Sequence, residues 1–318
     1  MRSQHEHYEV GPLPRRIRRR VLGTTGAVVA GIAASSVLVA CSGGTPTAGS
    51  PVVAKKADKV ISAPAGLQAG GEPQPSGFMW VLAGTGATKT IDQLTLGSES
   101  AGKVQRILPV SLSASTLAES SSGLVALGLA TATTGAVTFL NGATGTQTGS
   151  TPLGAPVLDL VAGADGSTFY ALNGTATSMS VSVITSLSNQ VTSTVPVPLD
   201  TVSIAIQPNQ QNILALEPTG KLLEIGVASG RVISQFSVGT GAHSVALSND
   251  GSSLYVLKNA GGAFNVGVID SATERQVKAL PAPANTVGVQ VSLDGSLVYD
   301  LVGTPRYGNI QMFATGRQ

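Results

Sequence analysis

The stretch HSVALSNDGSSLYVLKNAGGAFNVGVIDSATERQVKALP, residues 243–281, decides the fold of this chain. It contains four short runs rich in Val, Leu and Ile, each too short for a helix but long enough for a β-strand. The first two runs flank Asn249-Asp250-Gly251, which is typical of a tight turn because these residue types tolerate positive φ. Four such strands in about forty residues predict one antiparallel sheet of the size of a propeller blade.

The second strand of this unit, Leu254–Leu257, recurs along the chain. Six copies end in the leucines Leu82, Leu127, Leu172, Leu216, Leu257 and Leu301. Successive leucines are 45, 45, 44, 41 and 44 residues apart. This period predicts an all-β protein in which residues 55–318 form a β-propeller of six four-stranded blades. The last copy has three strands, so we expect Lys59–Ser62 to pair with Asn309–Phe313 as its outer strand and to close the ring.

The repeat is similar to that of a known family. Leu254-Tyr255-Val256 and the later segment Val266–Thr273 resemble the YVTN-type β-propeller repeat. The resemblance covers roughly residues 55–318 and is strongest in the fifth copy. It implies a propeller of a kind common in secreted or surface bacterial proteins, and it implies no single activity because propellers are scaffolds for many functions.

Residues 1–40 predict an export signal rather than part of the fold. A cluster of arginines at 15–20 precedes Val21–Ala40, which carries no charge. The sequence Leu38-Val39-Ala40-Cys41 resembles a bacterial lipoprotein signal, in which the chain is cleaved between Ala40 and Cys41 and the cysteine thiol receives a diacylglycerol. An uncleaved membrane anchor is the alternative, since 20 apolar residues can span a bilayer. Both the general secretory and the twin-arginine export routes stay open.

The segment after the cysteine predicts how the domain is attached, and the net charge of the rest of the chain restricts its partners. Residues 41–54 are rich in Gly, Ser, Thr and Pro and predict a flexible tether. Six of the 19 basic and two of the 17 acidic side chains precede Cys41, so the rest of the chain has 13 basic and 15 acidic side chains, a net charge of −2. No cluster of Lys and Arg is left to hold a phosphate backbone, and we expect no nucleic-acid partner.

Few residues are candidates for chemistry. His243 is the only histidine after the signal, and with Cys41 acylated we expect no metal site and no cofactor. Asp300 is the only charged residue at a position occupied elsewhere by Val81, Ala126, Ala171, Ala215 and Val256. Strand alternation predicts that all six face a neighbouring blade, where an isolated carboxylate is costly, so we expect Arg306 or Tyr307 to pair with Asp300. A ligand or cation site at Asp300 is the alternative.

The sequence favours a non-catalytic function. We expect a lipid-anchored propeller on the outer face of the bacterial cytoplasmic membrane that binds an envelope protein or polymer through its rim loops. One alternative is an enzyme similar to lactonases or quinone-dependent dehydrogenases, with carboxylates such as Asp165, Asp200 and Asp294 approaching the channel. Another is an accessory subunit of an envelope complex.

Overall fold

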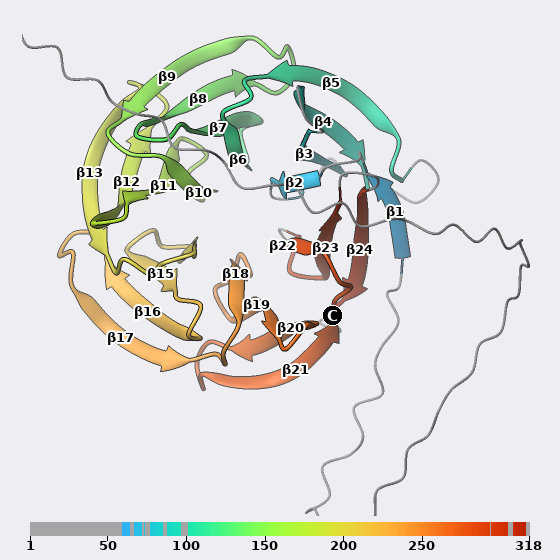
Figure 1. Cartoon of the computed structure of the whole chain (residues 1–318), viewed down its shortest axis with the longest axis vertical. Helices are drawn as coiled ribbons and strands as arrows, with labels where there is room; N and C mark the ends of the chain where they lie inside the picture. The colour runs from blue at the N-terminus through green and yellow to red at the C-terminus, as the bar shows by residue number, and fades with distance from the viewer. Residues whose placement is uncertain are drawn as a thin grey trace, which may run out of the picture. The chain divides into compact units, whose positions relative to one another are not determined.

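The structure is a computed structural model that describes residues 59–63, 67–71, 73, 77–84, 88–96, 101–292, 294–304 and 308–315. Within these ranges every regular element is a β-strand, and the strands form six four-stranded antiparallel sheets. Figure 1 shows the sheets arranged as the blades of a ring around one axis. The chain is therefore a six-bladed β-propeller, as predicted. None of the described segments forms a helix long and apolar enough to cross a bilayer.

The blades follow the chain order, and we number them I to VI. Blade I comprises β2 (Leu67–Gly70), β3 (Phe78–Gly84), β4 (Lys89–Thr95) and β5 (Val104–Val110). Blade II comprises β6 (Ala114–Glu119), β7 (Leu124–Ala130), β8 (Gly135–Asn141) and β9 (Gln147–Leu153). Blade III comprises β10 (Val157–Ala162), β11 (Thr168–Thr175), β12 (Ser178–Thr185) and β13 (Gln190–Val197). Blade IV comprises β14 (Ser203–Ile206), β15 (Asn212–Leu216), β16 (Lys221–Gly226) and β17 (Val232–Ser237). Blade V comprises β18 (Ala242–Leu247), β19 (Ser253–Ala260), β20 (Ala263–Asp270) and β21 (Arg275–Pro281). Blade VI comprises β22 (Thr286–Val291), β23 (Leu297–Gly303), β24 (Gly308–Ala314) and β1 (Lys59–Ala63).

Blade VI joins the two ends of the chain. β1 pairs antiparallel with β24, so that Lys59 lies opposite Met312 and Ser62 lies opposite Asn309. This is the ring closure predicted from the incomplete sixth repeat. It gives β24 a partner on both edges and leaves no blade short of a strand.

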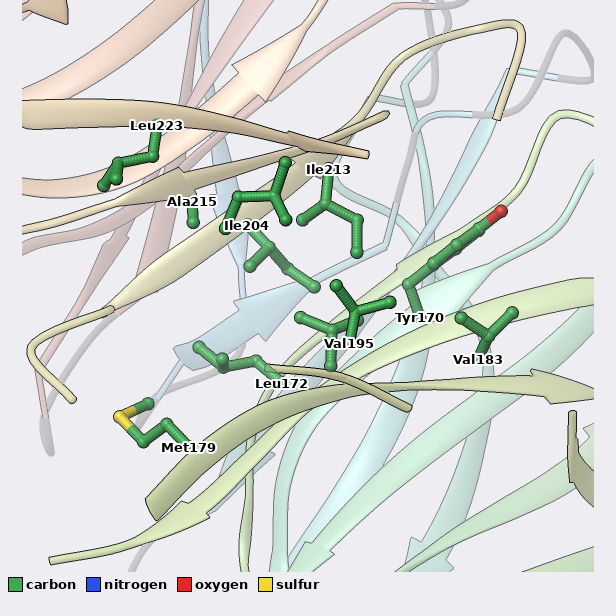
Figure 2. Close-up of a cluster of buried hydrophobic side chains, with 11 residues drawn as sticks. Tyr170, Leu172, Met179, Val183, Val195, Ile204, Ile213, Ala215 and Leu223 are labelled. Carbon is green, nitrogen blue, oxygen red and sulfur yellow. The ribbon is translucent and has the colours of Figure 1, made fainter. Parts of the chain in front are cut away.

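Apolar side chains between adjacent blades form the core. Figure 2 shows the cluster between blades III and IV, in which Tyr170 and Leu172 of β11 face Ile213 and Ala215 of β15. Comparable buried clusters lie at each of the other five blade interfaces. Because each sheet buries both of its faces in this way, no blade could hold its structure without its neighbours.

The repeat alignment needs one correction, in blade II. In blade III the pairing of β10 with β11 shifts at a bulge, and Leu172 is the first residue paired beyond it, opposite Asp159. In blade II the residue at that place is Gly128. The alignment that placed Leu127 there is therefore wrong by one residue.

The shift reverses the faces of β7. Ala126 packs toward blade III, in the same cluster as Ala171, instead of toward the preceding blade as expected for this position. The local packing explains why a glycine replaces the leucine. A Cβ atom on Gly128 would lie 2.6 Å from the Thr116 side chain and 2.7 Å from the Val157 side chain, so the inner strands of blades II and III occupy the space that a leucine would need.

Candidate axial channel and rim

The innermost strands of the six blades enclose a channel along the ring axis. Two hollows of about 270 and 160 Å³ occupy it, and both are lined by all six blades. They share a waist made of Gly70, Leu117, Asp159, Leu160, Ser203, Ser244 and Gln290. The larger hollow opens at the carboxyl ends of the innermost strands, by Ala164 and Asn249, and the smaller one opens at their amino ends, by Leu158 and His243. We call these openings the carboxyl mouth and the amino mouth.

Polar groups at the waist hold adjacent blades together. The Asp159 carboxylate in blade III accepts hydrogen bonds from the Ser203 hydroxyl and the Ile204 N–H of blade IV, both at 2.9 Å. The Ser203 hydroxyl oxygen in turn accepts from the Val245 N–H of blade V at 3.3 Å. The other Asp159 oxygen accepts from the Leu160 N–H at 2.9 Å. Both oxygens of this channel carboxylate are thus engaged in the scaffold.

Similar hydrogen bonds join two further pairs of adjacent blades. The Gln290 amide of blade VI donates to the Gly70 carbonyl of blade I at 2.9 Å, and the Ser115 hydroxyl of blade II donates to the Val157 carbonyl of blade III at 2.8 Å. Burial raises the pKa of the Asp159 carboxyl above its usual range, and the hydrogen bonds from Ile204, Ser203 and Leu160 oppose part of that rise.

The aspartates at the carboxyl mouth stabilise their own turns. Asp294 accepts hydrogen bonds from the hydroxyls of Ser292 and Ser296, which lower the pKa of its carboxyl. At Asp165, partial burial alone would raise the carboxyl pKa, but the hydrogen bonds from Thr168 and Ser167 outweigh it and the pKa is lowered. The following Gly166 and Gly295 have φ of 73° and 69°, as the turn requires. These two carboxylates, which the sequence suggested as channel groups, serve as turn caps.

Three of the six residues around the edge of the amino mouth are apolar. At or just before the start of each innermost strand, one residue lines this opening: Gln68, Ser115, Leu158, Val202, His243 and Val287. We call Leu158, Val202 and Val287 the collar; their side chains are 49%, 38% and 40% exposed. Leu112 and Leu199, in the loops that lead into blades II and IV, are 55% and 53% exposed. Five exposed branched apolar side chains therefore lie on the face of the ring that carries the amino mouth.

Of the other predicted site residues, His243 lies exposed at the amino mouth, and its ring centroid is 6.4 Å from that of Phe264. Cys41, Ala40, Arg306 and Tyr307, the predicted signal and the predicted tether lie outside the described residues. In the part of the chain that is described, no three His, Cys, Asp or Glu side chains are grouped closely enough to hold a metal ion.

Asp300 lies away from the channel lining, inside the interface between blades V and VI. It is fully buried, opposite Val289 on one side and Gln311 on the other. Within the described residues neither of its oxygens has a hydrogen-bond partner. Desolvation raises the pKa of this carboxyl to about 7. The ring-closing blade therefore carries a carboxyl group that burial favours in its neutral form.

The collar is the feature that sequence reasoning missed. The equivalent position is a bulge in five of the six blades, where the register of the innermost strand shifts by one, and Leu158 and Val287 are two of these bulge residues. Val202 of blade IV directly precedes β14, whose register does not shift. A bulge turns an apolar residue outward at a place where simple alternation would bury it. The signal that could have found it is that Leu158, Val202 and Val287 recur at the same place in their repeats.

Comparisons with known proteins support the fold alone. No protein-family model matches the sequence, and no curated protein matches it. Among solved structures, hydrazine synthase from Kuenenia stuttgartiensis aligns with a TM-score of 0.61, over 80% of this chain and 96% of that chain, at 11% sequence identity. An identity this low indicates a shared propeller architecture, and a shared architecture does not determine activity.

Proposed function

We propose that this chain is an exported, lipid-anchored β-propeller that acts as a non-catalytic binding or scaffold protein on the outer face of the bacterial cytoplasmic membrane. The observation that carries the binding role is the apolar collar at the amino mouth, with side chains 38% to 49% exposed on a rigid ring. Exposed apolar groups that gather at one opening of a rigid scaffold are typical of a protein-binding surface. The proposed partner is an envelope protein.

The use of the polar waist supports a scaffold role over an enzymatic one. The oxygens of Asp159 and Ser203 accept hydrogen bonds from backbone and side-chain groups of blades III, IV and V. The carboxylates of Asp165 and Asp294 accept hydrogen bonds from the hydroxyls of their own turns. A catalytic carboxylate instead needs an oxygen that is available to the reacting group.

The anchor is proposed from Leu38-Val39-Ala40-Cys41, and the described part of the chain begins in blade VI. Lys59 lies beside Met312, near the end of β24. β24 runs in the same direction as the innermost strand β22, because both are antiparallel to β23. The start of β1 and the end of β24 are therefore on the side of the carboxyl mouth, and the collar is on the opposite face of the ring.

Mass spectrometry of the mature N-terminus tests the anchor. We expect the first residue to be Cys41 with a diacylglyceryl group. Cys41→Ser removes the thiol that accepts the lipid, so this variant should remain uncleaved or leave the membrane fraction, because the acyl chains provide the membrane anchor. A mature protein that retains residues 1–40, or that has an unmodified Cys41 thiol, would contradict the anchor.

Co-purification from solubilised membranes tests the binding role. Full-length protein with a C-terminal affinity tag is compared with the variant Leu158→Ser/Val202→Ser/Val287→Ser and with a control variant at the carboxyl mouth, Ala164→Ser/Asn249→Ser. Both sets of side chains are exposed, so all three proteins should melt at similar temperatures. We expect proteins retained by the wild type and the control to be lost from the collar variant. An identical set of retained proteins for all three would contradict the role of the collar.

A further inference from the structure

The outer wall of the ring consists of strand edges. In blades I to V the fourth strand, β5, β9, β13, β17 or β21, bonds to the third strand on one side, and no strand of the described residues pairs with its other side. Figure 1 shows these strands along the circumference. An edge of this kind presents unpaired N–H and C=O groups that can pair with another chain, and proteins commonly block such edges with proline.

Four of these five edges carry a proline at the same structural place. Each proline lies four residues after the bulge residue of its strand: Pro109 opposite Thr90, Pro152 opposite Ala136, Pro196 opposite Ser180 and Pro281 opposite Asn265. Proline has no N–H and is tolerated in a sheet only where the nitrogen faces away from the partner strand. The prolines therefore remove an outward donor from the edges of blades I, II, III and V.

Blade IV is the exception, because Ser237 stands at this place opposite Lys221. The Val238 N–H donates to the Gly220 carbonyl at 2.7 Å. In an antiparallel ladder the hydrogen-bonded and non-hydrogen-bonded pairs alternate, so the neighbouring pair of Ser237 and Lys221 is a non-hydrogen-bonded one. The Ser237 N–H consequently points away from β16, toward the open edge.

β17 also carries exposed apolar side chains, as do β5, with Ile107 58% exposed, and β21. Its bulge residue, Ile233, is 59% exposed, and the preceding Val232 is 51% exposed. In blades II and III the bulge residue is a threonine whose hydroxyl donates to a carbonyl of the third strand, Thr148 to Phe139 at 3.3 Å and Thr192 to Val183 at 3.2 Å. Blade IV thus combines an edge that proline does not block with exposed apolar side chains.

The outer strands of blades V and VI are less open to pairing than β17. In blade V the bulge residue Val277 is 65% exposed, but Pro281 blocks that edge. In blade VI the outer strand is β1, which has only five residues, and a short edge strand offers little backbone for pairing. Among the described outer strands, β17 is therefore the one best suited to accept another strand.

We propose that β17 is a docking edge for an extended segment of another protein, which adds to blade IV as a fifth strand. The edge itself specifies this occupant, since backbone donors and acceptors spaced along a strand are matched by an extended backbone. Six residues span about 20 Å, which is too little for two rigid propellers to bury the roughly 1,200 Å² of a stable interface, whereas a flexible segment needs no second contact surface. This site is separate from the collar and does not depend on it.

The test uses the full-length protein in detergent and a phage-displayed library of random twelve-residue peptides as the probe. The affinity of selected peptides is measured by fluorescence anisotropy for the wild type, Ser237→Pro and Pro281→Ser. We expect Ser237→Pro to weaken binding at least about tenfold, a loss of about 1.4 kcal/mol or more. We expect Pro281→Ser to add a second site, which raises the stoichiometry from about one peptide to two because it opens the edge of blade V. Amide exchange in Val232–Ser237 should slow when the peptide is bound.

Three outcomes would overturn the proposal. In the first, the selected peptides bind Ser237→Pro as tightly as the wild type. In the second, no peptide protects the amides of β17. In the third, light scattering shows a wild-type dimer that Ser237→Pro converts to a monomer, so that a second copy of the chain is the occupant. Ser237→Pro should keep the wild-type melting temperature, because the equivalent place accepts proline in four other blades. A collar variant should bind the peptides normally, which separates failure here from failure of the binding role proposed above.

Discussion

The Asp159 carboxylate of blade III accepts a 2.9 Å hydrogen bond from the Ser203 hydroxyl of blade IV. The same carboxylate oxygen accepts from the Ile204 N–H, so one side chain fixes the start of the next innermost strand. The contact joins positions 44 residues apart, which is one repeat period. It indicates that the channel waist is part of what makes the ring cooperative.

The first prediction concerns this joint. Asp159→Ala should lower the free energy of unfolding by about 2–4 kcal/mol, because it leaves the N–H groups of Ile204 and Leu160 without their acceptor. Asp159→Asn keeps one acceptor oxygen and should fall between Asp159→Ala and the wild type. Urea unfolding followed by circular dichroism measures both. If Asp159→Ala unfolds at the wild-type midpoint, the waist bonds do not stabilise the ring.

The second prediction concerns pH and Asp300. The carboxyl pKa is raised from 3.8 to about 7 in the folded chain, so the folded state holds a proton that the unfolded state has lost between these values. This contribution to stability is complete below about pH 4 and is lost as the pH rises to about 7. Over that range the loss is on the order of 4 kcal/mol as an upper figure.

The variant Asp300→Val isolates this effect, because Val occupies the equivalent place in blades I and V. The stability of Asp300→Val relative to the wild type should rise between pH 4 and 7 and stay constant above pH 7. Thermal melts across the pH range measure it, with Val81→Ala as a control that changes size without charge. A difference between Asp300→Val and the wild type that does not vary with pH would show that Asp300 is already ionised in the folded chain over this range, and would contradict a raised pKa.

The third prediction concerns ring closure. A chain that begins at Gly66 lacks β1 and should melt well below one that begins at Val52, because β24 loses its outer partner and blade VI is left with three strands. The cost should be several kcal/mol, more than most single substitutions produce. Differential scanning calorimetry compares the two chains. Melting temperatures within a degree or two of each other would mean that β1 does not contribute to the closed ring.

Much of the fold could be predicted from the sequence because repetition is a long-range signal. The period of the closing leucines required six similar sheets, and the strand missing from the sixth copy pointed to Lys59–Ser62. The prediction failed locally, in blade II, where Leu127 resembles a closing leucine but lies one residue too early. Gly128 takes the place of the leucine because Val157 of the next blade fills the space, a contact that no single repeat reveals.

The candidate site was less predictable than the fold. The exposure of Leu158 depends on a bulge in β10, and a bulge depends on how two strands pair rather than on either strand alone. The sequence likewise could not show that Asp165 and Asp294 cap turns, because it does not say which hydroxyls their oxygens reach. The sequence singled out Asp300 because the equivalent positions in the other five repeats are apolar. It could not show which side chains surround Asp300, because these depend on how the blades pack together.

Site-specific photo-crosslinking in intact cells tests the central claim, the binding role of the collar, most directly. A photoreactive phenylalanine derivative is placed at Leu158, Val202 or Val287 of the collar, or at Ala164 or Asn249 of the carboxyl mouth, all in full-length protein. We predict adducts of one discrete mass from the collar positions, which disappear when the two remaining collar residues are changed to Ser, and none from the carboxyl mouth. Adducts that form only from the carboxyl mouth, or collar adducts that persist after those changes, would contradict the account.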